Sequence, residues 1–385
     1  MREINSPIIG SLREQFFAVL DGGTDVNMGI NYGLNIKLDI YGGSHDEKIG
    51  MTLSGIPAGE VIDMDALRLF MARRAPGRDA YSTARREADE PVFLSGLDEN
   101  VTNGEMIEAV IYNTNQRSGD YSSLVDTPRP SHADFTARMK YGEGVDLRGG
   151  GHFSGRLTAP MCIAGGICLQ ILERRGIKIG AHICSIGSVS DARFDPVFVT
   201  EEDFDIVHSR RFPVLDEDAG ERMKKEIESA RLQGDSVGGT VECAAIGLPA
   251  GLGEHMFASV EGAISSVVFG IPAVKGIEFG AGFESARMLG SQNNDPFVTD
   301  GSRVTTKTNN AGGILGGMSS GMPVIFRAAI KPTPSIAIEQ DTVSLSRMEN
   351  VKITVGGRHD PCIVPRAVPV FEAAAALAIF DLMEG

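Results

Sequence analysis

The sequence predicts a single domain of mixed helices and strands, α/β or α+β, that begins near residue 28. Residues 34–40 alternate apolar and polar side chains without a break, which is the period-2 pattern of a half-buried strand. Residues 158–174 form an apolar run rich in alanine, glycine, cysteine and isoleucine, which is typical of a helix buried on all sides. Because no shift in composition marks a linker along the 385 residues, we expect one folded unit.

The elements before the buried helix begin with a hairpin, because Met51 and Leu53 continue the alternation beyond the first strand. The next segment, "DMDALRLFMARRAPGR", predicts a helix capped by Asp63 or Asp65 and stopped by Pro-Gly. Arginines in its last turn are favourable for the helix dipole alone, so the pattern does not by itself assign them a function.

The second half predicts three further helices and several strands. We expect a charged surface helix over 217–232, a strand within 235–249, a small-residue helix followed by a strand within 257–283, a glycine loop and strand within 308–336, and a long alanine-rich helix that ends near 383.

Composition narrows the class of protein. The 51 acidic residues against 36 Lys and Arg give a net charge of −15, which argues against nucleic acid or an anionic membrane as the main partner. No window approaches the ~18–20 apolar residues that a membrane span needs. The five cysteines are scattered and never spaced C-x-x-C, as expected for reduced thiols in a cytoplasmic protein. No H-x-x-x-H or C-x-x-C pair is present either, so we expect no metal site.

Histidines and arginines beside glycine turns are the candidates for chemistry. His45 follows Gly-Gly-Ser at the end of the first strand, His132 lies in Arg-Pro-Ser-His-Ala-Asp, and His359 lies in Gly-Arg-His-Asp-Pro. A histidine can move a proton near neutral pH, but a lone loop histidine is more often ordinary surface. Arginines cluster near the same motifs, and guanidinium groups match phosphate and carboxylate oxygens in pairs. If these side chains converge, the substrate is a polyanion.

Several familiar alternatives lack their motifs. The sequence contains no G-x-S-x-G nucleophile elbow and no G-x-x-x-x-G-K-[ST] phosphate loop. Residues 312–321, "GGILGGMSSG", allow a weak hypothesis of a small-molecule kinase with a glycine loop, although no Mg²⁺ or ATP constellation accompanies them.

Taken in order, the motifs resemble those of the chorismate synthase family. The match runs over residues 31–383 through "GGSH", "RRAPG", "RPSHAD", "DLRGGGHFSGRLTAP", "DSVGG", "PAVKGIEFG", "GSQNN", "NNAGGILGGMSSG", "KPTPSI" and "GRHDP". So many motifs in the right sequence make a chance match very improbable.

The resemblance implies a fold and an activity. The fold is an α+β, chorismate-synthase-like β-α-β sandwich with a helical layer between antiparallel sheets, assembled as a homotetramer. The activity is a carbon–oxygen lyase reaction, the 1,4-anti elimination of phosphate from 5-enolpyruvylshikimate 3-phosphate to give chorismate. It requires reduced FMN without net redox change, and the flavin is reduced by an NAD(P)H-dependent or other external source. Residues 28–385 would form the catalytic domain, and residues 1–27 match nothing in the family.

The resemblance also implies roles for individual residues. His45 would protonate the departing phosphate, His132 would protonate or stabilise the reduced flavin, and Asp360 would help the flavin accept the substrate proton. Substrate anions would bind to Ser44, Arg74, Arg129 and Arg156. The flavin would contact His152, Phe153, Ser154, Pro272, Ala273, Gly316, Lys331, Pro332, Thr333, Pro334, Ser335 and Arg358.

The sequence departs from the family pattern at several motif positions, and two of them adjoin the proposed catalytic histidines. Asp46 follows the first histidine where the family usually has glycine, and it places a negative charge beside the proposed acid. Ser131 replaces the glycine commonly found before the second histidine. These departures leave open a catalytically silent flavin- or phosphate-binding protein on the same fold, although the presence of His45, His132 and Asp360 favours the enzyme.

Overall fold

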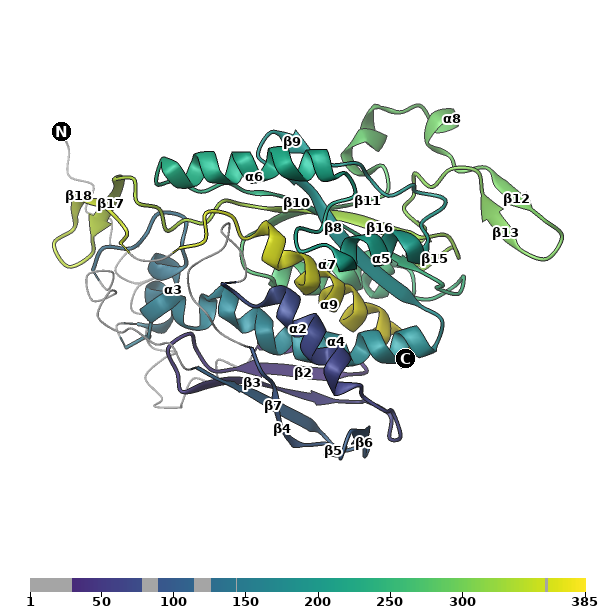
Figure 1. The fold of residues 1–385 in the computed structure, drawn as a ribbon, viewed down its shortest axis with the longest axis horizontal. Coiled ribbons are helices and arrows are strands. Elements are labelled where there is room, and N and C mark those ends of the chain that lie inside the picture. Colours follow the sequence, from purple (N-terminus) through teal and green to yellow (C-terminus); the bar gives the residue numbers. More distant parts are fainter. Residues whose placement is uncertain (1–29, 78–88, 114–125, 143, 357–358) are drawn as a thin grey trace, which may run out of the picture.

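The computed structural model describes residues 30–77, 89–113, 126–142, 144–356 and 359–385. The proposed extension, residues 1–27, lies outside this range, and the domain boundary at residue 28 stays a prediction. Two antiparallel sheets enclose a layer of helices, and Figure 1 shows the sheets below and above that layer. The α+β sandwich expected from the resemblance is therefore confirmed.

The first sheet has five strands in the order β1-β2-β3-β7-β4. These are β1 (Ile30–Tyr32), β2 (Lys37–Tyr41), β3 (Lys48–Ser54), β7 (Ile107–Tyr112) and β4 (Val92–Ser95). In the β2–β3 hairpin, Ile40 pairs with Met51 and Leu38 pairs with Leu53, so one face of the pair is apolar and buried. The sheet thus has one face toward the core, as its alternating sequence predicts.

The strand predicted over residues 34–40 corresponds to β2, which begins three residues later than expected, at Lys37. The three residues before it turn around the carboxylate of Asp381, whose oxygens accept hydrogen bonds from the backbone N–H groups of Leu34, Asn35 and Ile36 at 2.7–3.1 Å. Alternation alone does not reveal this capping by a residue near the end of the last helix.

The second sheet has the order β11-β16-β10-β8-β9. Its strands are β11 (Val274–Phe279), β16 (Val324–Ile330), β10 (Gly239–Ile246), β8 (Lys178–Ile186) and β9 (Val189–Ser190). This sheet is apolar on both faces. Cys243 and Phe326 belong to the main core, whereas their neighbours Ala244 and Ile325 pack with Phe204 in a smaller cluster on the other side.

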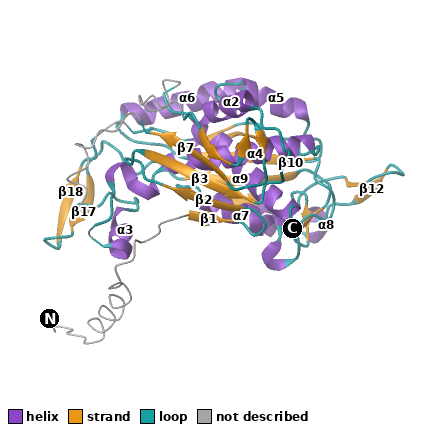
Figure 2. Cartoon of the chain, turned by 90° about the horizontal axis from the view of Figure 1, so that it is seen from below, coloured by secondary structure: helices purple, strands orange, loops and turns teal. Residues whose placement is uncertain are grey.

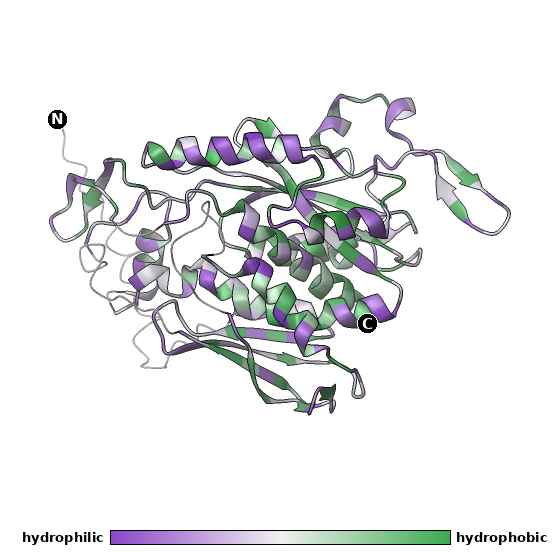
Figure 3. Cartoon of the chain, in the orientation of Figure 1, coloured by the Kyte–Doolittle hydropathy of each residue, from purple (hydrophilic) through white to green (hydrophobic). Residues whose placement is uncertain are grey.

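Four helices lie between the sheets: α2 (Met64–Arg74), α4 (Thr158–Arg174), α7 (Val260–Gly270) and α9 (Val364–Met383). Figure 2 shows the same layering from below, and in Figure 3 the helices α4 and α9 are mostly coloured as hydrophobic. A Cβ atom on Gly165 of α4 would lie 2.5 Å from Cα of Ala373 in α9, so the two backbones touch. The small residues in α4 therefore allow it to pack directly against α9, as expected for a helix that is buried on all sides.

One segment, Gly155–Arg174, is long and apolar enough to cross a membrane by length and composition, contrary to the sequence-based expectation. The structure places 83% of its most apolar window inside the protein, where it forms the central helix α4. A buried core helix and a membrane span share this composition, so the finding is weak evidence for a membrane.

A buried carboxylate joins the helical layer to the second sheet. Glu372 of α9 accepts two hydrogen bonds from the guanidinium of Arg73, at 2.6 and 2.8 Å, and is contacted by Nε2 of His208 at 3.1 Å. It also accepts a hydrogen bond from the backbone N–H of Ala181 in β8. Burial alone would raise the pKa of Glu372, but Arg73 and His208 outweigh it and lower the pKa to about 2.

The remaining elements lie outside the sandwich. The helices α5 (Glu201–Ser209) and α6 (Glu217–Leu232) cover the second sheet, and α3 (Asp134–Tyr141) and α8 (Gly290–Asn293) are short. Four separate pairs of short strands form hairpins: β5–β6 (Leu97–Asp98 with Val101–Thr102), β12–β13 (Phe297–Thr299 with Val304–Thr306), β14–β15 (Ile314–Leu315 with Met318–Ser319) and β17–β18 (Gln340–Ser344 with Glu349–Ile353). Single turns of 3-10 helix are Arg148–Phe153, Gly155–Leu157, Met256–Ala258 and Gly282–Arg287.

Candidate active site

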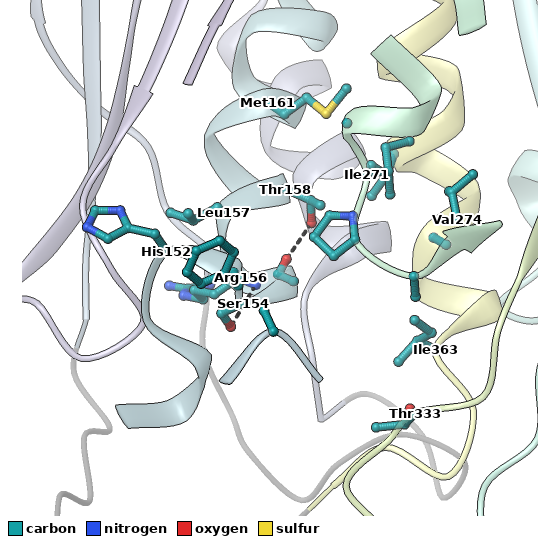
Figure 4. A pocket seen from close by; sticks show the side chains of 18 of the residues that line it. His152, Ser154, Arg156, Leu157, Thr158, Met161, Ile271, Val274, Thr333 and Ile363 are labelled. Atoms are coloured by element: carbon teal, nitrogen blue, oxygen red, sulfur yellow. Dashed lines mark hydrogen bonds between the residues drawn. The ribbon is translucent and has the colours of Figure 1, made fainter. Parts of the chain in front are cut away.

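A cavity of about 860 Å³ opens at one end of the helical layer. In Figure 4, residues from His152 to Met161 form one wall, and Ile271, Val274, Thr333 and Ile363 form the wall opposite. The first wall leads into α4, and the second combines the turn between α7 and β11, the segment after β16 and the start of α9. The volume is typical of a small-molecule or cofactor site, for which ~300–1,000 Å³ is usual.

A triple-glycine turn separates the two candidate histidines. Gly149, Gly150 and Gly151 all have positive φ angles, of 59°, 94° and 52°. A Cβ atom on Gly149 would lie 2.5 Å from Nδ1 of His45, and a Cβ atom on Gly150 would lie 3.5 Å from Nε2 of His132. Glycine is required at Gly149 because of both this approach and its φ angle. His45 is buried behind Gly149, which lines the cavity, whereas His132 lines the cavity itself.

Ser44 lies beside His45 in the loop between β2 and β3. Its backbone N–H donates to the carbonyl of Gly151 at 3.2 Å, which fixes this loop against the glycine turn. Its hydroxyl is buried and makes no hydrogen bond to any residue that the structure describes. A buried hydroxyl without a protein partner is unusual, and it is a candidate for contact with a ligand or water.

His132 is oriented by a neighbouring carboxylate. Nδ1 of His132 lies 2.6 Å from Oδ1 of Asp134, and Asp134 also accepts two hydrogen bonds from the Arg129 guanidinium, at 2.7 and 2.8 Å. Burial would raise the pKa of Asp134, but its contacts with Arg129 and His132 outweigh it and hold the pKa far below the ordinary range. The carboxylate stays ionised and, with the Arg129 guanidinium 3.1 Å from the same Nδ1, holds the ring in place, which leaves Nε2 for other partners.

Arg129 connects this pair to the opposite wall, because its Nη1 donates to Oγ of Ser335 at 3.1 Å. The predicted substrate ligands Arg74 and Arg156 also line the cavity, where both are buried. Both donate to a single carboxylate, that of Asp89, and Arg74 does so at 2.5 Å. Three guanidinium groups thus converge on one cavity in a chain of net negative charge.

Asp360 lines the cavity from the segment before α9. Its carboxylate is 2.5 Å from Nη1 of Arg366, whose Nε donates to the backbone carbonyl of Arg74 at 3.2 Å. The proposed proton-handling carboxylate is therefore tied to the same helix end that carries a predicted substrate arginine.

Most of the predicted flavin ligands also line this cavity. They are His152, Phe153, Ser154, Pro272, Ala273, Lys331, Thr333, Pro334 and Ser335. Pro332 does not line it, and Gly316 lies in the exposed turn between β14 and β15, away from the other ligands. Arg358 lies outside the described residues. In the described ranges, no group of three or more His, Cys, Asp or Glu side chains could hold a metal ion.

Two non-glycine residues of the cavity wall have backbones in the left-handed region. Ser131 has a φ of 59° and Ala273 a φ of 75°. Such residues are strained, and they concentrate at functional sites where the surrounding structure holds them. The carbonyl of Ala273 accepts a hydrogen bond from the backbone N–H of Lys331, and the carbonyl of Ser131 accepts one from the side chain of Lys331.

Comparison with known proteins gives the same family. The family model described as chorismate synthase matches residues 36–383. The chain belongs to the chorismate synthase family. Curated chorismate synthases from Lancefieldella parvula and Thermococcus gammatolerans are 44% and 45% identical to it; the first alignment covers 91% of this chain and 95% of the relative, the second 91% and 96%. A crystal structure of a chorismate synthase superposes with a TM-score of 0.71 at 25% identity, over 91% of this chain and 92% of that one.

These comparisons confirm the family, the fold class and the lyase activity predicted from the sequence: elimination of phosphate from 5-enolpyruvylshikimate 3-phosphate to give chorismate. Sequence reasoning assigned no role to Asp89 or Asp134, and it counted Arg366 only among the arginines near the motifs. Asp134 stands in the motif that pointed to His132, and its spacing of two residues was a usable signal. Asp89 carries no such signal, because it stands in an ordinary charged run and meets its arginines only in the folded chain.

Proposed function

We propose that the cavity between α4, α7 and α9 is the site of chorismate synthesis and that it binds reduced FMN beside the substrate. The observation that carries the proposal is the convergence of Arg74, Arg129 and Arg156 on one cavity whose glycine turn contacts His45 and His132. The substrate has two carboxylates and a phosphate, and buried arginines are the side chains best suited to hold such groups.

The residues of the cavity fit a flavin. The wall of Ile271, Pro272, Ala273, Val274 and Ile363 is apolar, as the face of a flat ring system needs. Two buried polar atoms in the walls, Nδ1 of His152 and Oγ1 of Thr333, have no hydrogen-bond partner among the described residues. Buried polar atoms are rarely left without a partner, so they support a polar ligand at this place.

The proposed roles follow from position. Arg74, Arg129 and Arg156 bind the substrate anions, and His45, buried behind Gly149, donates a proton to the departing phosphate. His132, held by Asp134, lines the cavity and would protonate or stabilise the reduced flavin there. Asp360, held by the ion pair with Arg366, would help the bound flavin to accept the proton that leaves the substrate carbon. Reduced FMN, when bound, supplies an electron-rich ring that assists cleavage of the carbon–oxygen bond without net redox change.

The test is anaerobic turnover. The purified protein is mixed with 5-enolpyruvylshikimate 3-phosphate, with and without dithionite-reduced FMN, and chorismate absorbance and phosphate release are followed. We expect both products in equal amounts and only with reduced flavin. The variants His45→Ala, His132→Ala and Asp360→Ala should each lower kcat strongly while FMN still binds. Flavin binding without turnover by the unmodified chain would instead identify a silent relative.

We further propose that the flavin is reduced by an external, NAD(P)H-dependent or other source in the cytoplasm. The residues that line the described cavity are already assigned to the flavin and the substrate, and we assign none of them to a nicotinamide cofactor. Turnover under anaerobic conditions with NADPH and oxidised FMN, without added reductase, would contradict this proposal.

We propose in addition that the chain assembles as a homotetramer. The β12–β13 hairpin projects from the body of the protein in Figure 1, and its side chains Phe297 and Val304 are 66% and 60% exposed. Nearby Phe283 and Leu289 are also exposed, at 79% and 68%. Large apolar side chains gathered in this way mark interaction surfaces. Sedimentation of the purified protein should give the mass of four chains, and a monomer would contradict it.

A further inference from the structure

One buried carboxylate, that of Asp89, accepts hydrogen bonds from two of the arginines that line the cavity. Oδ2 of Asp89 accepts a hydrogen bond from Nη1 of Arg74 at 2.5 Å, and Oδ1 accepts one from Nη1 of Arg156. The side chain of Asp89 is 0% exposed, whereas those of the arginines are 3% and 6% exposed. The carboxylate therefore lies behind the guanidinium groups, on the side away from solvent.

Each arginine is also held by a second group. Nε of Arg74 donates to Oγ1 of Thr158 at 3.1 Å and Nη2 donates to the carbonyl of Gly155 at 2.9 Å. Nε of Arg156 donates to Oδ1 of Asn113 at 3.2 Å. These three contacts are neutral, whereas Asp89 gives both arginines a negative charge that they share. Without it, two buried guanidinium groups would face each other and repel.

The charge state of Asp89 agrees with this arrangement. Burial would raise its pKa, but the charges of Arg74 and Arg156 outweigh burial and lower the pKa below its usual value. The carboxylate is ionised at neutral pH, and the three side chains together keep one positive charge in excess. A substrate anion is therefore still attracted to the pair.

The backbone at Asp89 lies in the left-handed region, with a φ of 51°. Aspartate is one of the few residues with a side chain that adopt this region. The two ion pairs with the arginines hold its side chain in place there.

We propose that Asp89 is a positioning residue for substrate binding, which holds Arg74 and Arg156 side by side so that both guanidinium groups bind one substrate. The inference rests on the proposed role of these arginines. It assigns to Asp89 no contact with substrate or flavin. Loss of the carboxylate therefore weakens substrate binding and leaves flavin binding unchanged.

The experiment measures three quantities on the full-length protein: the KM for 5-enolpyruvylshikimate 3-phosphate in anaerobic turnover with reduced FMN, kcat, and the Kd of oxidised FMN. For Asp89→Asn we expect KM to rise roughly tenfold to a hundredfold, as for the loss of one or two charge-assisted hydrogen bonds. The Kd of FMN should stay unchanged. Glu90→Gln is the matched control, because this neighbouring carboxylate is 62% exposed and pairs with Arg68 on the surface.

A second variant covers the case in which Asp89→Asn does not fold. Asp89→Gly suits the positive φ angle and leaves a space between the guanidinium groups that formate can fill. We expect formate to lower the raised KM of Asp89→Gly and to have no such effect on the unmodified protein. A purely structural role would move the melting temperature but would not give a KM that depends on formate.

The outcomes separate the inference from the function on which it rests. An unmodified protein that does not turn over would overturn the proposed function. If it does turn over, a KM that is unchanged or lowered in the Asp89 variants would overturn the inference, and a lowered KM would show that Asp89 competes with substrate. A Kd for FMN that rises together with KM would also overturn it, because the effect would then not be confined to the arginines.

Discussion

Gly149 and His45 are in direct contact across the wall of the cavity, with room for no side chain between them. Because Gly149 also has a φ of 59°, both its conformation and its surroundings require glycine. Gly149→Ala should therefore displace the imidazole and lower kcat by on the order of a hundredfold, the effect that a shift of about 1 Å has on a catalytic group.

The control for this substitution is Gly144→Ala in the same loop, where an added Cβ atom would meet nothing within 4 Å. It should leave kcat unchanged. A Gly149→Ala protein with the kcat of the unmodified enzyme would show that His45 has no part in the reaction.

The carboxylate of Asp134 orients the imidazole of His132 through a contact of 2.6 Å. Asp134→Asn keeps the shape but offers an amide in place of the charge, so we expect kcat to fall by at least about a hundredfold, as when an orienting carboxylate is neutralised. Stopped turnover assays measure the change, with Asp341→Asn on the exposed strand β17 as the control. An unchanged kcat in Asp134→Asn would contradict the orienting role.

Ser131 stands where the family usually has glycine, and its φ of 59° gives a physical reason for that preference. Ser131→Gly should raise the free energy of unfolding by about 0.5–1 kcal/mol, since relief of left-handed strain, roughly 1–2 kcal/mol, exceeds the added chain entropy of glycine. Urea denaturation measures the change. Ser229→Gly in helix α6 is a matched control and should change stability in the opposite direction.

Glu372 should make stability depend on pH. Its pKa is lowered to about 2, so its contribution is complete above about pH 4.5 and is lost as the pH falls through about 2. At pH 7, Glu372→Gln should lower the free energy of unfolding by about 3–5 kcal/mol, because one partner of a buried ion pair is removed. The difference between the two proteins should shrink as urea denaturation is repeated toward pH 2. The exposed pair of Glu228 offers a control, since Glu228→Gln should have no measurable effect.

Elements with a strong period were predictable from the sequence. The bounds of α4 and α6 follow their expected ranges, and α2 begins after Asp63, whose side chain accepts hydrogen bonds from the N–H groups of Asp65 and Ala66. Local patterns suffice there because side-chain spacing and capping are properties of neighbours in the chain. The order of strands in the two sheets was not predictable in this way, and it came from the resemblance to the family.

The site was predictable only where the motif and the contact coincide. His132 and Asp134 are two residues apart, and the sequence shows them together. Asp89 contacts Arg156 from 67 residues away, so this pairing leaves no local pattern in the sequence. Asp360 contacts Arg366, six residues further on in the first turn of α9, a spacing that by itself predicts no contact. Gly316 shows the converse: its glycine motif is distinctive, but the fold places it outside the cavity.

The capping of Leu34, Asn35 and Ile36 by Asp381 has a consequence for synthesis of the chain on the ribosome. The donors leave the exit tunnel about 345 residues before the carboxylate that satisfies them. At translation rates of 5–20 residues per second, that interval is roughly 20–70 s. Throughout it the central helix α4 and strands β8 and β10 of the second sheet have no helix α9 to pack against, so their apolar faces stay uncovered until the last helix arrives.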